Sequence, residues 1–110
     1  MKNIIVYSGD SYSANLALWD LMVRIFTRND IPIKKAKKEC FMILTPNCEI
    51  RFAWRAIIPI VTIGNRYDAV FGFPEELFNN FIVSRTYVDT LIDSNSLGLD
   101  SYVKSVEEVE

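Results

Sequence analysis

The stretches Cys48-Glu-Ile-Arg-Phe-Ala-Trp54 and Gly64-Asn-Arg-Tyr-Asp-Ala-Val-Phe-Gly-Phe-Pro-Glu-Glu-Leu77 decide the fold of this chain. In the first, apolar and polar residues alternate with the period of two of a strand, which places Arg51 and Arg55 on one face. In the second, a short apolar run leads to Pro74, a residue suited to the first turn of a helix. Together they predict the middle of an α/β sheet.

The residues before these stretches predict a strand, a turn and a helix. Residues 3–7 are apolar and β-branched, as in a strand buried on both faces. A Gly- and Ser-rich turn follows, and apolar residues then recur at helical spacing over residues 13–28, with Ser13 as the expected N-cap. Residues 31–38 are expected to connect this helix to a hairpin whose strands are residues 39–44 and 48–54.

The residues after the hairpin predict two further helices and a central strand. Pro59 marks residues 56–63 as an edge strand or an irregular crossing. Residues 68–73 are predicted to form a central strand. Helices are expected near residues 74–84 and in the acidic tail after Ser94. We therefore predict one α/β domain over residues 1–110, with a central sheet of four to five strands and two or three helices.

The composition limits the class of protein. The chain has 110 residues, of which half are apolar, so it has enough bulky side chains to form a core. No apolar run approaches the roughly 18 residues of a membrane span, and the N-terminal apolar stretch is too short for a secretory leader. We therefore expect a soluble, cytoplasmic protein, in the host cytoplasm if it is phage-encoded, with no membrane partner.

The cysteines and the missing histidine bear on chemistry. Cys40 and Cys48 flank the predicted hairpin. They could form a disulfide or half of a metal site, or they could be two small apolar side chains in a reducing compartment; we favour the last. The chain has no histidine, which excludes Ser-His and Cys-His nucleophile pairs. The sequence contains no complete catalytic motif, and we predict no catalytic residue, cofactor or metal ion.

The charge is unevenly spread. Residues 1–66 carry a balance of +5 and residues 67–110 a balance of −7, within a net charge of −2. Such asymmetry bears on the charge of the binding partners, and the basic half predicts an interaction surface. Its candidate residues are Lys34, Lys35, Lys37, Lys38, Arg51, Arg55, Arg66 and Tyr67, the tyrosine being expected as an exposed contact. The alternative is that the lysines only keep a neighbouring edge strand from pairing.

The order of these elements resembles a pared-down P-loop core of the bacteriophage terminase or helicase type. The resemblance rests on the opening strand and helix and on residues 49–54 and 64–73, about two thirds of the chain. The turn over residues 8–15 departs from it, because a phosphate-binding loop needs more glycines and a Lys-Ser/Thr pair. The resemblance therefore implies a degenerate relative, and ATP hydrolysis is not expected.

We predict a non-catalytic bacteriophage or mobile-element protein that binds a host protein, such as a host defence nuclease that it inhibits. One alternative is a nucleic-acid-binding accessory protein that uses the basic segment 34–38. A second is a divalent-metal nuclease built on Glu49, with Asp30 and Asp68 as metal partners. Homodimers are a further possibility, through an edge near Pro59 or through the apolar tail.

Overall fold

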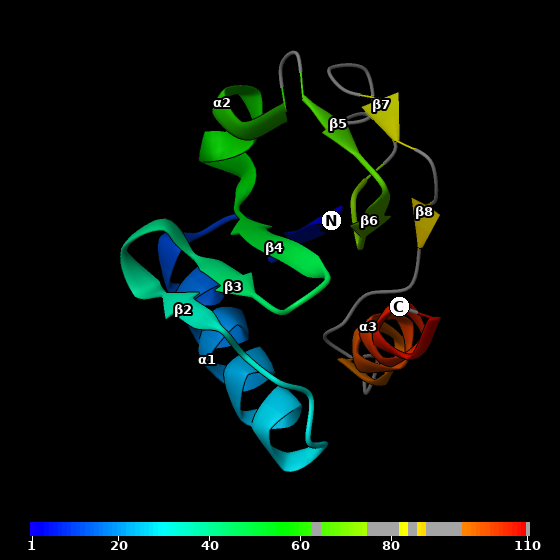
Figure 1. Ribbon diagram of the computed structural model, residues 1–110. Coiled ribbons are helices and arrows are strands. Elements are labelled where there is room, and N and C mark those ends of the chain that lie inside the picture. The colour runs from blue at the N-terminus through cyan, green and yellow to red at the C-terminus, as the bar shows by residue number, and fades with distance from the viewer. Residues whose placement is uncertain (63–64, 75–81, 84–85, 88–95, 110) are drawn as a thin grey trace.

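A six-stranded mixed sheet, in the order β2-β3-β4-β1-β6-β8, runs through the molecule (Figure 1). The structure is a computed structural model that describes residues 1–62, 65–74, 82–83, 86–87 and 96–109. The parallel strands are β1 (Lys2–Tyr7), β4 (Cys48–Ala53), β6 (Ala69–Phe71) and β8 (Thr86–Tyr87). The strands β2 (Lys35–Lys37) and β3 (Met42–Leu44) extend the sheet in antiparallel fashion. The predicted α/β class is confirmed, with six strands where four to five were expected.

Helices lie on both faces of the sheet. Figure 1 shows α1 (Tyr12–Arg28) and α3 (Ser96–Val109) on one face, with α2 (Ile58–Thr62) on the other. A two-stranded sheet of β5 (Arg66–Tyr67) and β7 (Ile82–Val83) lies on the α2 side. Side chains of β1 enter both cores: Ile4 packs with α1 and α3, and Ile5 packs with α2. The prediction that this strand is buried on both faces is confirmed.

The first helix begins one residue before its predicted range. Ser11, and not Ser13, is the N-cap, because its Oγ accepts a hydrogen bond from the Ala14 N–H at 3.1 Å. Its extended backbone, with φ of −130°, is the conformation that an N-cap requires. One buried stripe of α1 then packs on the sheet, which is the pattern that the helical spacing predicted.

The acidic tail docks as a helix, as predicted. Leu99 and Val103 of α3 are fully buried in the same core as α1. Glu107 also ties α3 to the β3–β4 turn, because its carboxylate accepts hydrogen bonds from the Asn47 backbone N–H at 3.3 Å and side-chain Nδ2 at 3.1 Å. The helix that carries Glu107 and Glu108 is therefore held against the sheet.

The segment between α1 and β4 differs from the prediction. Residues 31–38 contain the edge strand β2, and a 3-10 turn, η1 (Lys38–Cys40), takes the place of the first part of the predicted strand 39–44. Phe41 follows with φ of 51°, a left-handed conformation that breaks an extended strand. The strand therefore starts only at Met42.

The residues around Pro59 are helical. The turn η2 (Arg55–Ile57) leads into α2. Of the two alternatives predicted for residues 56–63, an edge strand or an irregular crossing, the edge strand is therefore wrong. Pro59 lies in the first turn of α2, where the missing N–H has no helical partner to lose. The edges of the main sheet are β2 and β8, and the edge expected near Pro59 is absent from the described residues.

The predicted helix near residues 74–84 is wrong at its end, because Ile82–Val83 form strand β7. The rest of that prediction falls on residues 75–81, which lie outside the described residues. The predicted central strand is confirmed as β6, which lies between β1 and β8. Within the described part of the chain, no helix is both long enough and apolar enough to cross a membrane.

Candidate interaction face

Two of the four lysines lie on one face of the edge strand. In β2, Lys35 is paired with Leu44 of β3 and Lys37 with Met42. In the next ladder Met42 is paired with Arg51 of β4, and Leu44 with Glu49. Because directly paired residues lie on the same side of a sheet, two rows cross the three strands, Lys37–Met42–Arg51 and Lys35–Leu44–Glu49. We name these six residues the basic strip.

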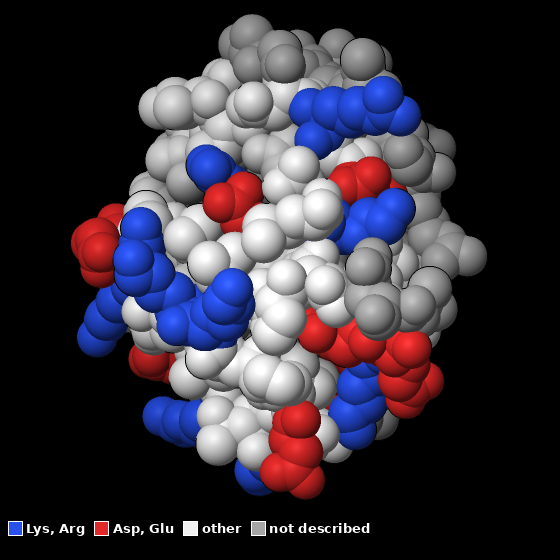
Figure 2. Space-filling model, viewed as in Figure 1, with Lys and Arg blue, Asp and Glu red and all other residues white. Residues whose placement is uncertain are grey.

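The basic strip lies beside α2 and not under it. The core on that face contains residues of α2, β1, β4, β5 and β6, but none of β2 or β3. Lys35 is exposed, Lys37 is half-buried, and the Arg51 side chain is 46% exposed. Met42 between them is almost completely buried, which fits cover by long charged side chains that keep their charged ends in water. In Figure 2, blue side chains gather on the side where Figure 1 places β2.

The strip is positively charged. Among the described residues its one ion pair joins Arg51 Nε to Glu49 Oε2 at 3.8 Å, an exposed contact of small energetic value. Lys35 and Lys37 have no ion-pair partner among the residues that the structure describes. Two lysine charges therefore remain open to an acidic partner.

The remaining predicted cations do not join the strip. Lys34 precedes β2, and its backbone N–H donates to Leu44 O at 2.7 Å. Lys38 begins η1, and Arg66 is exposed on β5. The expectation that Arg51 and Arg55 share a strand face is wrong, because β4 ends at Ala53 and Arg55 lies in η2.

Arg55 belongs to a cluster at the carboxyl ends of β1 and β4. Its Nε lies 3.0 Å from Asp10 Oδ1, and the Tyr7 hydroxyl donates to the same oxygen at 2.9 Å. The hydrogen bond from Arg55 and then the one from Tyr7 lower the pKa of Asp10. Burial, followed by the bond to Asp10, raises the pKa of Tyr7. The Arg55 charge is thus compensated locally, which the sequence could not indicate because Asp10 is far away along the chain.

Tyr67 is not an exposed contact, contrary to the prediction. The residue is 4% exposed, and its hydroxyl donates to Val61 O at 2.6 Å. Burial raises the pKa of Tyr67, an effect partly offset by the nearby charge of Arg51. Tyr67 therefore packs against α2 and exposes almost no surface to a partner.

The turn after β1 is hydrogen-bonded to α1 and β4. Ser8 Oγ lies 2.7 Å from Asn15 Oδ1 and 3.0 Å from Ala53 O, and Asn15 Nδ2 donates to Phe52 O at 3.1 Å. In open α/β sheets, ligands usually lie at the carboxyl ends of the strands. Here the polar side chains at that edge join β1 to α1 and β4, and Asp10 is paired with Arg55.

The acidic residues of the nuclease hypothesis do not converge. Asp68 Oδ2 accepts a hydrogen bond from the Asn3 N–H at 2.8 Å, Glu49 lies beside Arg51, and Asp30 follows α1. In the described parts of the chain, no three Asp, Glu, Cys or His side chains are placed to hold a metal ion. The two cysteines are also apart: both are free, Cys40 exposed in η1 and Cys48 buried at the opposite end of the hairpin.

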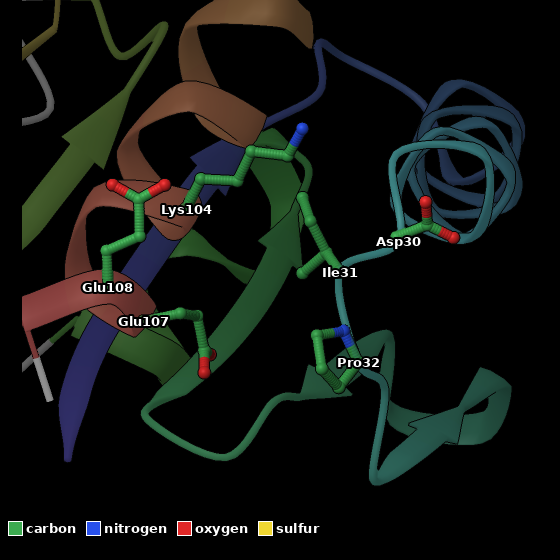
Figure 3. Close-up of a pocket in the computed structure, with 6 residues that line it drawn as sticks. All are labelled: Asp30, Ile31, Pro32, Lys104, Glu107 and Glu108. Carbon is green, nitrogen blue, oxygen red and sulfur yellow. The ribbon is translucent and has the colours of Figure 1, made fainter.

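A cavity of about 300 Å³ lies between α3 and the segment that follows α1. Figure 3 shows the Lys104 side chain reaching over Ile31, while the carboxylates of Asp30 and Glu108 point in different directions. Glu107, which also lines the cavity, already binds Asn47. The charged groups therefore surround the cavity without meeting at one point in it.

Comparisons with protein-family models, with curated proteins and with solved structures found no match to this chain.

Proposed function

We propose that this chain is a non-catalytic binding protein that docks on an acidic protein surface through the basic strip. The observation that carries the proposal is the pair of open lysine charges, Lys35 and Lys37, above a sheet face that no described helix covers. Two rows of charged and apolar side chains give such a face both contact area and complementarity to negative charge.

The outer side of α2 favours a protein partner over nucleic acid. Ile60 is 77% exposed, and Ala56 and Pro59 are exposed beside it. This ridge lies on the same sheet face as the strip, because Ile58 packs in one core with Ala53, which is two residues from Arg51 along β4 and so shares its face. An exposed apolar ridge on the same sheet face as open cations resembles the apolar centre and charged rim of a protein interface.

Nucleic acid is the competing ligand. Sequence-tolerant binding of single strands uses aromatic rings on which bases stack, together with cations along the backbone. The strip has the cations, but none of its six residues is aromatic, and Tyr67 beside it is buried. The origin of the chain in a bacteriophage and the inhibition of a host defence nuclease stay predictions of the sequence.

The test is a tagged pull-down from bacterial lysate, with and without added nuclease. Four proteins are compared: wild type, Lys35→Glu/Lys37→Glu, Ile60→Glu, and Arg24→Glu as a charge control on the exposed side of α1. We expect wild type and Arg24→Glu to retain one stoichiometric protein partner after nuclease treatment. The double reversal should weaken its binding about tenfold or more, equivalent to about 1.4 kcal/mol.

Ile60→Glu should weaken the same complex by a comparable or larger factor, because truncated or charged anchors are costly at interface centres. Capture that disappears after nuclease treatment would identify nucleic acid as the ligand and contradict the proposal. Equal capture by all four proteins would remove the strip and the ridge as the binding surface.

A further inference from the structure

The free edge of β2 is the second notable feature of the basic strip. In the part of the chain that the structure describes, β2 is the last strand at its end of the sheet, and its residues are Lys35, Ala36 and Lys37. An edge strand presents unpaired backbone N–H and C=O groups to which another extended chain can hydrogen-bond. The register of the neighbouring ladders determines which of these groups face outward.

Hydrogen-bonded and non-hydrogen-bonded pairs alternate along an antiparallel ladder. The Phe52 N–H donates to Phe41 O, and the Thr45 N–H donates to Cys48 O, both at 2.9 Å. These two bonds fix the alternation in β3, so Ile43 directs its amide groups to β4, while Met42 and Leu44 direct theirs to β2.

The outward group of β2 follows from this register. Lys37 is opposite Met42 and Lys35 is opposite Leu44, so both lysines direct their backbone groups inward to β3. Ala36, which is opposite Ile43, directs its N–H and C=O away from the sheet. Ala36 is exposed, and its side chain is small enough to let a second backbone approach.

The lysine side chains decide which strand this edge can accept. Lys35 and Lys37 lie on one face, about 6.6–6.8 Å apart along the strand. An added strand lies about 4.8 Å away and repeats its side chains at the same spacing, so carboxylates at alternate positions would each face one lysine. The lysine side chains repel a basic strand, add no charge attraction to a neutral one and attract an acidic one.

We propose that the partner adds an acidic extended segment to the free edge of β2. The segment hydrogen-bonds to the Ala36 N–H and C=O and places acidic side chains at alternate positions against Lys35 and Lys37. This inference rests on the proposed function, which requires an acidic partner but not an added strand. It specifies the conformation of the partner segment and the backbone group that receives it.

The test uses the full chain, labelled with ¹⁵N, and a short blocked peptide in which glutamate alternates with valine. Two matched peptides carry N-methyl groups, one on the amides of the odd positions and the other on those of the even positions. Both keep the charge of the parent, but each removes the N–H donors along one edge of the peptide. A strand that pairs through one edge tolerates methylation of the other edge only.

We expect the parent peptide to shift the Ala36 amide resonance and to slow its hydrogen exchange at least tenfold. One methylated peptide should bind like the parent, and the other should bind at least tenfold more weakly. Equal binding of both methylated peptides, with Lys35→Glu/Lys37→Glu still abolishing it, would overturn strand addition and leave the acidic partner intact. Absence of binding by every glutamate peptide would overturn the inference, and the pull-down variants decide the proposed function separately.

A variant of the protein gives the complementary test. Ala36→Pro removes the outward N–H without removing a bond to β3, and proline is tolerated on edge strands at such positions. We expect it to keep the fold and to bind the parent peptide at least tenfold more weakly, while Arg24→Glu binds as wild type. Unchanged binding by folded Ala36→Pro would contradict strand addition. If the variant does not fold, the methylated peptides decide the question.

Discussion

At the scale of single residues, the end of α1 contains a backbone position better suited to glycine. The Ile31 N–H donates to Phe26 O at 2.9 Å and the Asp30 N–H to Thr27 O at 3.3 Å, which together form a Schellman motif. Its left-handed position is Asp30, with φ of 57°. Ile31 is buried behind it, as the apolar contact of the motif requires.

Asp30→Gly should therefore raise the free energy of unfolding by about 0.5 kcal/mol, measured by urea denaturation. The gain comes from relieving the left-handed strain, and the greater freedom of glycine in the unfolded chain offsets part of it. Asp20→Gly, inside α1, is the matched control and should lower the free energy by about 0.3 kcal/mol, the difference between the helix propensities of Asp and Gly. Loss of stability in both variants would contradict the capping geometry.

The two cysteines should differ in reactivity. Burial raises the pKa of the Cys48 thiol to about 11, whereas Cys40 is exposed. Since the thiolate is the reactive species, a thiol reagent at pH 8 should modify Cys40 in the folded protein and reach Cys48 only after urea is added. Rapid modification of two thiols per chain under native conditions would contradict the burial of Cys48. Cys40→Ser is the control that leaves Cys48 alone.

The same shift predicts a dependence of stability on pH. The thiol loses its proton near pH 9 in the unfolded chain but near pH 11 in the folded one. The unfolded state therefore binds fewer protons between these values, so stability is complete below pH 9 and falls as the pH rises to 11. The loss attributable to Cys48 is up to about 2–3 kcal/mol. Urea denaturation at pH 8 and pH 10 should show a smaller difference for Cys48→Ala than for wild type.

At the scale of elements, the sequence was sufficient to predict a helix or strand where the local pattern of apolar residues reflects burial. β1, α1, β4, β6 and α3 follow from apolar runs and spacing, because each is held by a continuous core contact. β2 was missed because three residues, two of them lysines, carry no apolar signal. α2 was missed because Pro59 suits a first helical turn as well as the edge of a sheet.

The candidate site was predictable to a similar extent. The alternation of β4 placed Arg51 correctly on the face opposite the main core, since that position depends on the strand alone. The roles of Arg55 and Tyr67 depend on Asp10 and Val61, which the fold brings together from other elements. Composition alone therefore grouped cations that the topology separates.

The docking of α3 predicts that its buried face contributes to global stability. Leu99 is fully buried, and Leu99→Ala should lower the free energy of unfolding by about 2–4 kcal/mol through lost burial and the cavity that remains. Ser101→Ala, on the exposed side of the same helix, should change it by less than about 0.5 kcal/mol. Urea denaturation followed by circular dichroism measures both. Equal effects of the two substitutions would show that α3 does not pack as described.

At the scale of the whole molecule, the basic strip and the acidic end of α3 lie on opposite faces of the sheet. The basic strip lies on the α2 side of the sheet, whereas α3, with Glu107 and Glu108, lies on the other side. Figure 2 shows a group of blue side chains on the side of β2 and a group of red ones on the side of α3, with both colours next to one another elsewhere. The net charge of −2 thus describes neither surface. A partner that approaches one side meets the field of the charged residues on that side.

This separation predicts retention on a heparin resin at low salt, although the net charge of the protein is negative. Wild type and Arg24→Glu should be retained at about 20 mM salt and released by about 150 mM, because surface charges are screened over roughly 8 Å at that ionic strength. Lys35→Glu/Lys37→Glu should pass through the resin at the lowest salt. Arg24→Glu changes the net charge in the same direction at one site outside the strip, and Arg24→Glu/Arg28→Glu matches the double reversal fully. Equal loss of retention in the two double variants would show that the polyanion responds to total charge and that the strip on β2 has no field of its own.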